Sequence, residues 1–224
     1  MKTYTITKSD LDADNYYIGQ EDVTDFSGHI HIEANLGWVR FKNGLRASGD
    51  IVAHARTGIE AGDGITAGLG ITAGYGIKAG WGITAGWGIT AGEGIEAGEG
   101  IKAGDGIKAG DGIKAGEGIK AGWGIEAGWG ITAGFGIIAQ LGIECKDVLS
   151  FNYGLYVGAC TWREATEKER QAICGKLEAD PSLVKLGEVV ETGLPEKAET
   201  IEVMGKLYNA EELRERLAEL KPLD

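Results

Sequence analysis

The sequence predicts a mainly β protein built as a β-solenoid, a fold in which short strands wind into stacked coils. The first observation is a six-residue unit, G-I-x-A-G-x, that repeats fourteen times between residues 58 and 142. The second is the glycine content, because 39 of the 224 residues are glycine and the excess lies in this repeat. A short fixed period of small and apolar residues is typical of solenoid proteins.

Residues 1–57 are predicted to form a β-rich cap at the N-terminal end of the solenoid. Residues 4–7, 29–34 and 38–41 read as short strands, the last two with the period of two expected of half-buried strands. Residues 45–53 already resemble the repeat in a degenerate form. A cap is expected because the end of a solenoid is an exposed sheet edge.

Residues 58–144 form the regular array, and each unit predicts one short strand and one corner. The isoleucine and the alanine are two residues apart, so both point inward if the I-x-A stretch is extended, and the residue between them points outward. The G-x-G stretch predicts a corner, because glycine tolerates positive φ and close approach of backbones. Stacked isoleucines would then be the main stabilising contacts, at about 0.8 kcal/mol per buried CH₂.

The number of units in a turn stays open at this point, because two or three units are both compatible with the period. Three units per turn would give about five coils in the array. A different geometry is also open: read in threes, every third residue from Ala61 is alternately alanine and glycine. A Gly-rich polyproline-II bundle demands small residues at that spacing. The β-solenoid is favoured, since I-x-A forms a natural strand and G-x-G a natural corner.

Residues 145–224 lose the period and are predicted to form a small α+β domain. Residues 149–157 and 187–192 read as strands. A helix is expected at residues 166–173, which begin with the T-x-x-E capping-box pattern. A second amphipathic helix is expected at residues 211–220, with leucines on one face.

The six-residue period resembles that of the hexapeptide-repeat proteins that form left-handed β-helices, a family that includes many acyltransferases. The register differs, because that family usually places a small residue two positions before the aliphatic one. Here Asp63, Tyr75 and Trp81 are among the residues at that position, and the small residue follows the isoleucine. The resemblance implies a solenoid fold and, as an alternative function, an acyltransferase-like enzyme with a histidine base. The phrase A-G-Y-G at residues 73–76 also looks like bacterial ice-nucleation repeats, which implies an ice-binding protein as another alternative.

The residue between the two glycines of each corner carries the informative variation of the array. In chain order these residues are Asp63, Leu69, Tyr75, Trp81, Trp87, Glu93, Glu99, Asp105, Asp111, Glu117, Trp123, Trp129, Phe135 and Leu141. From Tyr75 to Phe135 they read as three aromatics, five acids and three aromatics, arranged symmetrically about Asp105. Exposed aromatics typically anchor interfaces, and acids select the charge of the partner. We therefore predict that these eleven residues bind a protein partner or a second copy of the chain.

The lysines of the array offer a plainer interpretation of the corner acids. Lys102, Lys108, Lys114 and Lys120 lie on sides adjacent to the acids and could pair with them, leaving only a solvated surface. The six aromatics are harder to explain in that way, because exposed apolar patches usually mark a covered surface.

Composition and charge exclude several classes of partner and location. The formal net charge of −12 argues against direct binding to nucleic acid or to an anionic membrane. The sequence contains no stretch of about twenty apolar residues, so no membrane span is predicted. The start of the chain lacks a hydrophobic signal core. Three widely spaced cysteines without a C-x-x-C motif indicate reduced, buried thiols. We expect a cytoplasmic protein.

Catalytic residues are poorly represented, and we expect no enzyme activity, cofactor or metal. All three histidines, His29, His31 and His54, precede the array, and the first two lack a nearby third ligand. Cys160 and Cys174 have no histidine nearby in the sequence and read as core thiols. The sequence thus predicts a non-enzymatic binding scaffold or inhibitor. An acidic rod would also suit a phage or mobile-element anti-defence protein in a bacterial cytoplasm, acting as a nucleic-acid mimic.

Overall fold

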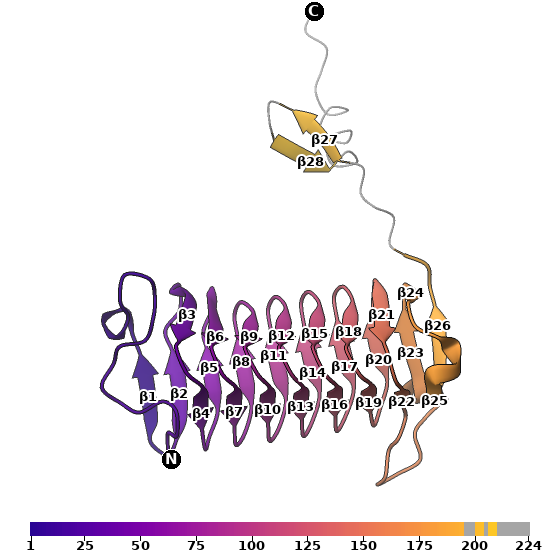
Figure 1. Cartoon of the computed structure of the whole chain (residues 1–224), viewed down its shortest axis with the longest axis horizontal. Coiled ribbons are helices and arrows are strands. Elements are labelled where there is room, and N and C mark those ends of the chain that lie inside the picture. Colours follow the sequence, from indigo (N-terminus) through magenta and orange to yellow (C-terminus); the bar gives the residue numbers. More distant parts are fainter. Residues whose placement is uncertain (195–199, 204–205, 210–224) are drawn as a thin grey trace, which may run out of the picture. The chain divides into compact units, whose positions relative to one another are not determined.

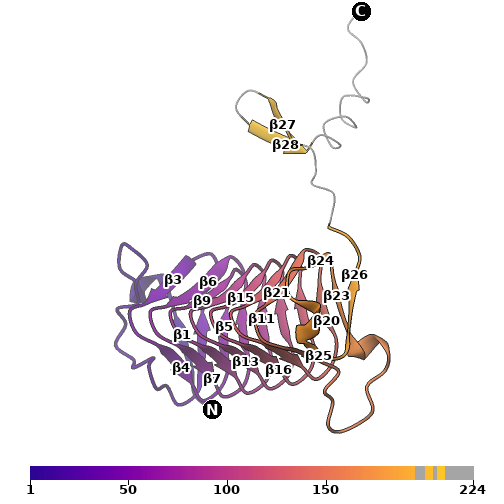
Figure 2. The ribbon, with the colours of Figure 1, turned by 45° about the vertical axis from the view of Figure 1, so that its right-hand side comes forward.

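The structure is a computed structural model that describes residues 1–194, 200–203 and 206–209. It divides into two units, Met1–Leu194 and Pro195–Asp224, and each is described by itself. The first unit is a parallel β-solenoid of about nine turns, so the predicted fold class is confirmed. Figures 1 and 2 show its coils stacked one on the next, with each coil contributing to three sheets.

Three parallel sheets form the walls of the solenoid, and the chain visits them in a fixed order. Sheet 1 contains β1 (Thr3–Ile6), β2 (His29–Ile32), β5 (Ile51–Ala53), β8 (Ile71–Ala73), β11 (Ile89–Ala91), β14 (Ile107–Ala109), β17 (Ile125–Ala127), β20 (Ile143–Cys145), β23 (Gln171–Cys174) and β26 (Glu188–Glu191). Sheet 2 contains β3 (Gly37–Phe41), β6 (Thr57–Ala61), β9 (Ile77–Ala79), β12 (Ile95–Ala97), β15 (Ile113–Ala115), β18 (Ile131–Ala133), β21 (Val148–Phe151) and β24 (Lys176–Leu177). Sheet 3 contains β4 (Leu45–Ala47), β7 (Ile65–Ala67), β10 (Ile83–Ala85), β13 (Ile101–Ala103), β16 (Ile119–Ala121), β19 (Ile137–Ala139), β22 (Leu155–Val157) and β25 (Val184–Leu186).

The register of the strands settles how many units make a turn. Ile83 pairs with Ile101, eighteen residues later, and the same spacing holds through the array. Three units therefore form each turn, and this parallel β pairing excludes the polyproline-II alternative. The isoleucine that opens each I-x-A strand lies inside with at most 2% of its surface exposed. Through most of the array it stacks on the isoleucine of the next coil, as Ile83 does on Ile101. Alanines stack on alanines in the same way, which confirms the predicted interior.

The corner glycines are required by close approach of neighbouring backbones. A Cβ atom at Gly98 would lie 2.0 Å from the carbonyl oxygen of Gly80 in the preceding coil. A Cβ atom at Gly100 would lie 3.2 Å from the carbonyl oxygen of Gly118, which is tight but close to tolerable. None of the array glycines has a φ in the left-handed region. Of the two glycine properties considered for these corners, the array uses close backbone approach and not positive φ.

The parallel pairing begins well before residue 58. Ile30 pairs with Ile51, and Ile51 pairs with Ile71, so β2 and β5 belong to the same stack as the array. The region between β1 and β2 covers the end of the first regular coil, with Leu11, Val23 and Phe26 buried against it. It includes the short 3₁₀ helix η1 (Lys8–Asp10). This irregular coil protects the sheet edge in the way expected of a cap.

The parallel pairing also continues past residue 144, where an α+β domain was predicted. The predicted strand at residues 149–157 is two strands, β21 and β22, separated by a corner. The predicted helix at residues 166–173 is absent, because the chain forms one 3₁₀ turn, η2 (Lys168–Arg170), and then strand β23. Pairing with β20 overrides the local helical preference, since Ala172 and Cys174 alternate inward and become buried. These added coils explain why the solenoid exceeds the expected five turns.

The last coil contains η3 (Pro181–Leu183) and the strand predicted at residues 187–192, which is present as β26. In the second unit, β27 (Thr200–Val203) pairs antiparallel with β28 (Lys206–Asn209). The helix predicted at residues 211–220 lies outside the described residues.

Candidate binding surface on the corners and faces of the solenoid

The corner residues fall into three columns that run along the solenoid, one between each pair of sheets. In each column a corner amide donates a hydrogen bond to the carbonyl of the corner residue one coil earlier, as from Glu99 to Trp81 at 3.2 Å. The column between sheets 2 and 3 consists of Asp63, Trp81, Glu99, Glu117, Phe135 and Tyr153. The column between sheets 3 and 1 consists of Leu69, Trp87, Asp105, Trp123 and Leu141. The column between sheets 1 and 2 contains Tyr75, Glu93, Asp111 and Trp129.

This arrangement distributes the aromatics and acids evenly around the coil. Each aromatic triplet places one ring on each of the three corners, and the five acids lie between the triplets. Every column therefore reads aromatic, acidic, aromatic along the solenoid. The structure brings residues of one column together and separates residues of different columns onto different edges.

The corner aromatics are open to solvent. The four tryptophans, Trp81, Trp87, Trp123 and Trp129, keep 54–58% of their surface exposed. Phe135 is also exposed, and Tyr75 is half-buried. Large apolar side chains exposed at regular positions on all three edges are typical of interaction surfaces.

The array lysines do not neutralise the corner acids. Two of them instead pair with a mid-strand glutamate on their own sheet: Lys78 and Lys114 lie 3.6 and 3.8 Å from Glu96. In residues 1–194, no ion pair involves Lys102 or Lys120. On sheet 1, Lys108 lies 2.8 Å from Glu126 in the next coil. Across residues 1–194, no ion pair involves any of the five corner acids of the aromatic–acidic–aromatic series. The predicted pairing of these lysines with the corner acids is therefore absent from residues 1–194.

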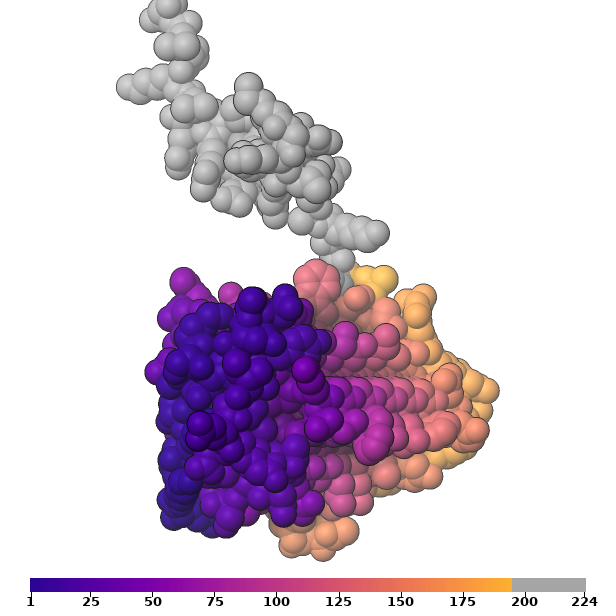
Figure 3. All heavy atoms as spheres, turned by 60° about the vertical axis from the view of Figure 1, so that its left-hand side comes forward, coloured from indigo at the N-terminus to yellow at the C-terminus, as the bar shows by residue number. Residues whose placement is uncertain are grey.

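The second glycine of each corner opens a groove along each sheet. Glycines in successive coils leave a strip without side chains between the corner column and the column of mid-strand residues. Outward atoms of successive coils line up in rows on the face shown in Figure 3. The grooves are shallow and open to solvent, with volumes of about 500 Å³ on sheet 1, 530 Å³ on sheet 2 and 720 Å³ on sheet 3. The largest is floored by Gly82, Gly100, Gly118, Gly136 and Gly154.

The groove on sheet 3 contains surface residues that sequence reasoning missed. Ile138, Tyr153 and Tyr156 line its C-terminal end and are all exposed. The Tyr153 ring packs edge-on against Phe135, with centroids 5.3 Å apart. A signal for them existed: Ile138 is the single apolar residue at the middle position of the array, and the tyrosines follow Phe135 and Ile138 by one eighteen-residue turn.

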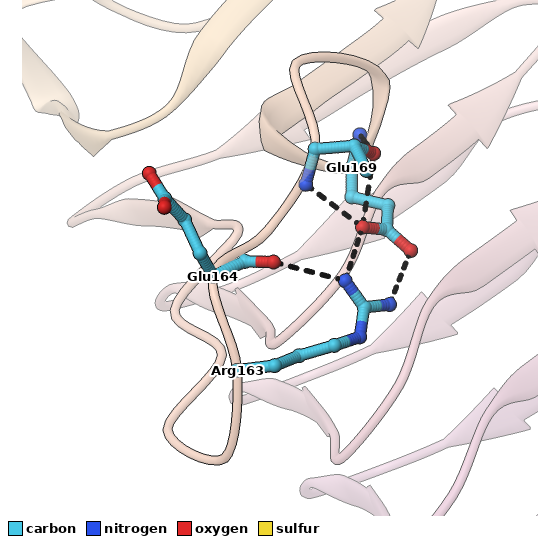
Figure 4. Close-up of polar contacts among 4 residues, drawn as sticks. Arg163, Glu164 and Glu169 are labelled. Carbon is cyan, nitrogen blue, oxygen red and sulfur yellow. Dashed lines mark hydrogen bonds and ion pairs between the residues drawn. The ribbon is translucent and has the colours of Figure 1, made fainter.

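An insertion at residues 158–170, between β22 and β23, lines the C-terminal end of the groove on sheet 1. Arg163 donates two hydrogen bonds to the Glu169 carboxylate, at 2.6 and 2.7 Å, as Figure 4 shows. The Thr166 amide and hydroxyl also donate to the Glu169 carboxylate. The Glu169 amide in turn donates to the Thr166 hydroxyl oxygen at 3.4 Å, so the two predicted capping-box contacts form without the helix. The hydrogen bond from Arg163, with those from Thr166, lowers the pKa of Glu169 to about 2. The insertion also exposes Trp162.

The three histidines lie on the first coils. The rings of His31 and His54 are 5.4 Å apart, edge to face, and the Asp50 amide donates to Nδ1 of His29 at 3.0 Å. Burial, followed by the neighbouring His54, lowers the pKa of His31. Among the residues that the structure describes, no group of three or more His, Cys, Asp and Glu side chains is arranged to hold a metal ion.

The three cysteines lie near the C-terminal end of the solenoid, away from the histidines of the first coils. Cys145 and Cys174 are buried in neighbouring coils, and burial raises the pKa of their thiols to about 12 and about 11. Cys160 lies half-buried in the insertion. Cys174 is thus a core thiol, as the sequence indicated, and Cys145 is one as well. The prediction that Cys160 is a core thiol is wrong, because it lies in the insertion and is only half-buried.

Known proteins provide no family for this chain: it matches no family model, no curated protein and no solved structure. The structure itself defines the class, a parallel β-solenoid with a turn of about eighteen residues. The resemblance to hexapeptide-repeat proteins extends to a repeat solenoid and no further. Within the described ranges, no helix has the length and apolar character needed to cross a membrane.

Proposed function

We propose that this protein is a non-enzymatic binding scaffold that holds a protein partner on the corners of the solenoid. The observation that supports the proposal most directly is the state of the corner acids. They form no ion pair in residues 1–194, and each column flanks them with aromatic side chains, all exposed except the half-buried Tyr75. Aromatic anchors beside uncompensated charge are the features that interfaces use for affinity and for selection of partner charge.

The dimensions of each edge suit a short segment of a partner. Neighbouring strands lie about 4.8 Å apart, so Trp81 and Phe135, three coils apart, are separated by about 14 Å along the axis. Trp87 and Trp123, two coils apart, are separated by about 10 Å. A partner segment with a basic centre and an apolar group on each side would match either edge.

A second copy of the chain fits these edges poorly. The columns are symmetric, so pairing two copies about a two-fold axis would oppose aromatic to aromatic and acid to acid. Glu99 of one copy would then face Glu117 of the other, and like charges across an interface oppose association. A different protein with basic residues is therefore the favoured partner.

An acidic mimic of nucleic acid is supported less well than a protein-binding scaffold. A mimic needs a continuous acidic strip, but lysines interrupt every face: Lys108 on sheet 1, Lys78 and Lys114 on sheet 2, and Lys102 and Lys120 on sheet 3. Inhibition of a host or competing protein through the corner columns remains part of the proposal.

The test is affinity capture from bacterial lysate with the full chain and matched variants. In the first variant, W81S, W87S, W123S and W129S are combined; in the second, E99Q, D105N and E117Q are combined. The tryptophan variant should lose the captured protein, because each anchor typically contributes more than about 1 kcal/mol. The amide variant should bind more weakly, and its remaining binding should depend less on salt.

The matched control changes four outward threonines on the strands to serine: T66S, T72S, T84S and T90S. Circular dichroism should show an intact β fold in all three variants. Capture that survives loss of the four tryptophans, or the lack of any specifically captured protein, would reject the proposal.

A further inference from the structure

The walls of the groove on sheet 3 change character along its length. One wall is the corner column between sheets 2 and 3, and the other is the column of mid-strand residues on sheet 3. Two successive coils oppose a glutamate to a lysine across the glycine floor: Glu99 to Lys102, and Glu117 to Lys120. The next two coils line the groove with apolar or aromatic side chains: Ile138 in one coil, and Tyr153 opposite Tyr156 in the next. Phe135, in the corner column, packs against Tyr153.

In the charged half of this groove, like charges are neighbours along each wall. Lys102 and Lys120 are directly paired across neighbouring strands, and like charges in that position destabilise a sheet. The two glutamates are also neighbours, in the corner column. No ion pair crosses this groove in residues 1–194. On sheet 2, by contrast, lysine and glutamate alternate along the mid-strand column and form ion pairs between neighbouring strands. This half keeps one basic and one acidic wall available to a ligand.

The apolar half of the groove places exposed apolar side chains next to the charged half. Ile138, Tyr156 and Tyr153 keep 37%, 41% and 66% of their surface exposed. Ile138 and Tyr156 are paired on adjacent strands, so their side chains form a continuous apolar strip beside Phe135 and Tyr153. Exposed apolar strips next to a groove are typical of binding sites.

We propose that this groove binds an extended peptide segment of a partner, with alternating basic and acidic residues next to two apolar residues. In an extended peptide, successive side chains point to opposite sides, so alternate residues would face the glutamate wall and the lysine wall. The four coils span about 14 Å, and an extended chain at about 3.3 Å per residue covers them with roughly five or six residues.

The inference deepens the proposed function at one corner and rests on it, because Glu99, Glu117 and Phe135 also belong to the corner column. The opposite wall is independent of the corners, and the experiment changes only residues of that wall. If the groove binds no peptide, the affinity capture that depends on the tryptophans can still succeed. If that capture fails, peptide binding to the groove can still be measured.

The test measures binding of capped synthetic hexapeptides to the full chain by isothermal titration calorimetry. The first peptide has two apolar residues followed by alternating Lys and Glu, and two others replace the alternating part by Lys only or Glu only. Wild type should prefer the alternating peptide. The variant K102E/K120E has two acidic walls and should shift its preference toward the Lys-only peptide by roughly tenfold, the sum of several exposed ion pairs.

A second variant, I138T/Y156T, tests the apolar half. Threonine occupies the equivalent position in earlier coils at Thr66 and Thr84, so the fold should tolerate it. Binding of the alternating peptide should weaken roughly tenfold, as expected for loss of apolar anchors. The matched control K108E/K114E makes the same double charge reversal on the other two sheets and should leave the peptide preference unchanged.

Four results would overturn the inference. Wild type could fail to bind the alternating peptide, or bind all three peptides equally. The variants of the sheet 3 wall could bind as wild type does. A neutral linear oligosaccharide such as cellohexaose could bind in preference to the peptides and lose affinity in I138T/Y156T, which would identify the groove as a glycan site.

Discussion

The two glycines of one corner provide a direct test of how this solenoid is held together. Gly98 and Gly100 flank the same exposed residue, Glu99, and neither has a φ in the left-handed region. A Cβ atom at Gly98 would lie 2.0 Å from the Gly80 carbonyl oxygen, whereas at Gly100 the nearest atom is the Gly118 carbonyl oxygen at 3.2 Å. We expect G98A to destabilise the protein strongly and G100A to leave it nearly unchanged.

The magnitude follows from the movement that each substitution requires. Real Cβ contacts are essentially never shorter than 3.0 Å, so G98A must separate two coils locally by about 1 Å. Two backbone hydrogen bonds join the coils at this point, from the Gly98 amide to the Ala79 carbonyl at 3.1 Å and from the Glu99 amide to the Trp81 carbonyl at 3.2 Å. A separation of about 1 Å would lengthen both beyond hydrogen-bonding distance. Overpacking and weakened hydrogen bonds together cost about 2–4 kcal/mol.

For G100A the neighbouring oxygen needs to move only a few tenths of an ångström. The reduced conformational freedom of alanine in the unfolded chain contributes about 0.4–1 kcal/mol in the opposite direction. The two effects largely offset each other, so we expect a change within about 1 kcal/mol.

The assay has to resolve individual coils, because repeat arrays often depart from two-state unfolding. Hydrogen exchange followed by mass spectrometry should show faster exchange in G98A around residues 79–101 and wild-type exchange in G100A. Urea denaturation should show a lower midpoint for G98A alone. Equal destabilisation by the two variants, or a neutral G98A, would refute the close-approach account of the corner.

Two further predictions concern ionisable groups. The pKa of Glu169 is lowered to about 2 chiefly by the hydrogen bond from Arg163, so its stabilising effect on the insertion should be complete above its ordinary pKa of 4.5 and lost as the pH falls through about 2. Carboxyl NMR titration should place the midpoint near 2, and R163M should move it back toward the ordinary value; a midpoint unchanged by R163M would contradict this. The thiols of Cys145 and Cys174, with pKa values raised by burial to about 12 and about 11, should resist alkylation in the native protein and react after denaturation. Cys160 should react first, and native labelling of either buried thiol at the same rate would contradict the prediction.

The local pattern of the unit was enough to predict the interior of the solenoid. In the I-T-A unit at residues 83–85, the isoleucine and alanine are buried and the threonine is exposed, as the period of two requires. The direction of a side chain in an extended strand depends only on neighbouring residues, so one unit carries this information. The same reasoning identified β1, β2 and β3 near the N-terminus.

The local sequence pattern gave the wrong secondary structure where strand pairing with a neighbouring coil competed with the local preference. Residues 166–173 form both capping-box contacts, but the second part of that segment pairs with the end of sheet 1 as strand β23. The glycines show the same limit, since the sequence indicated corners and only the structure showed which carbonyl oxygen each glycine approaches.

By itself the sequence determined the repeat, its strand and corner, and the order of aromatic and acidic residues at the corners. Only the tertiary structure decided that three units close a turn, and so which of those residues share an edge. It also decided that Lys114 pairs with Glu96 on its own sheet, while Lys102 and Lys120 stack on each other beside an open groove. These facts depend on contacts between residues eighteen positions apart, and that separation is fixed by the closure of the coil, which no single unit specifies.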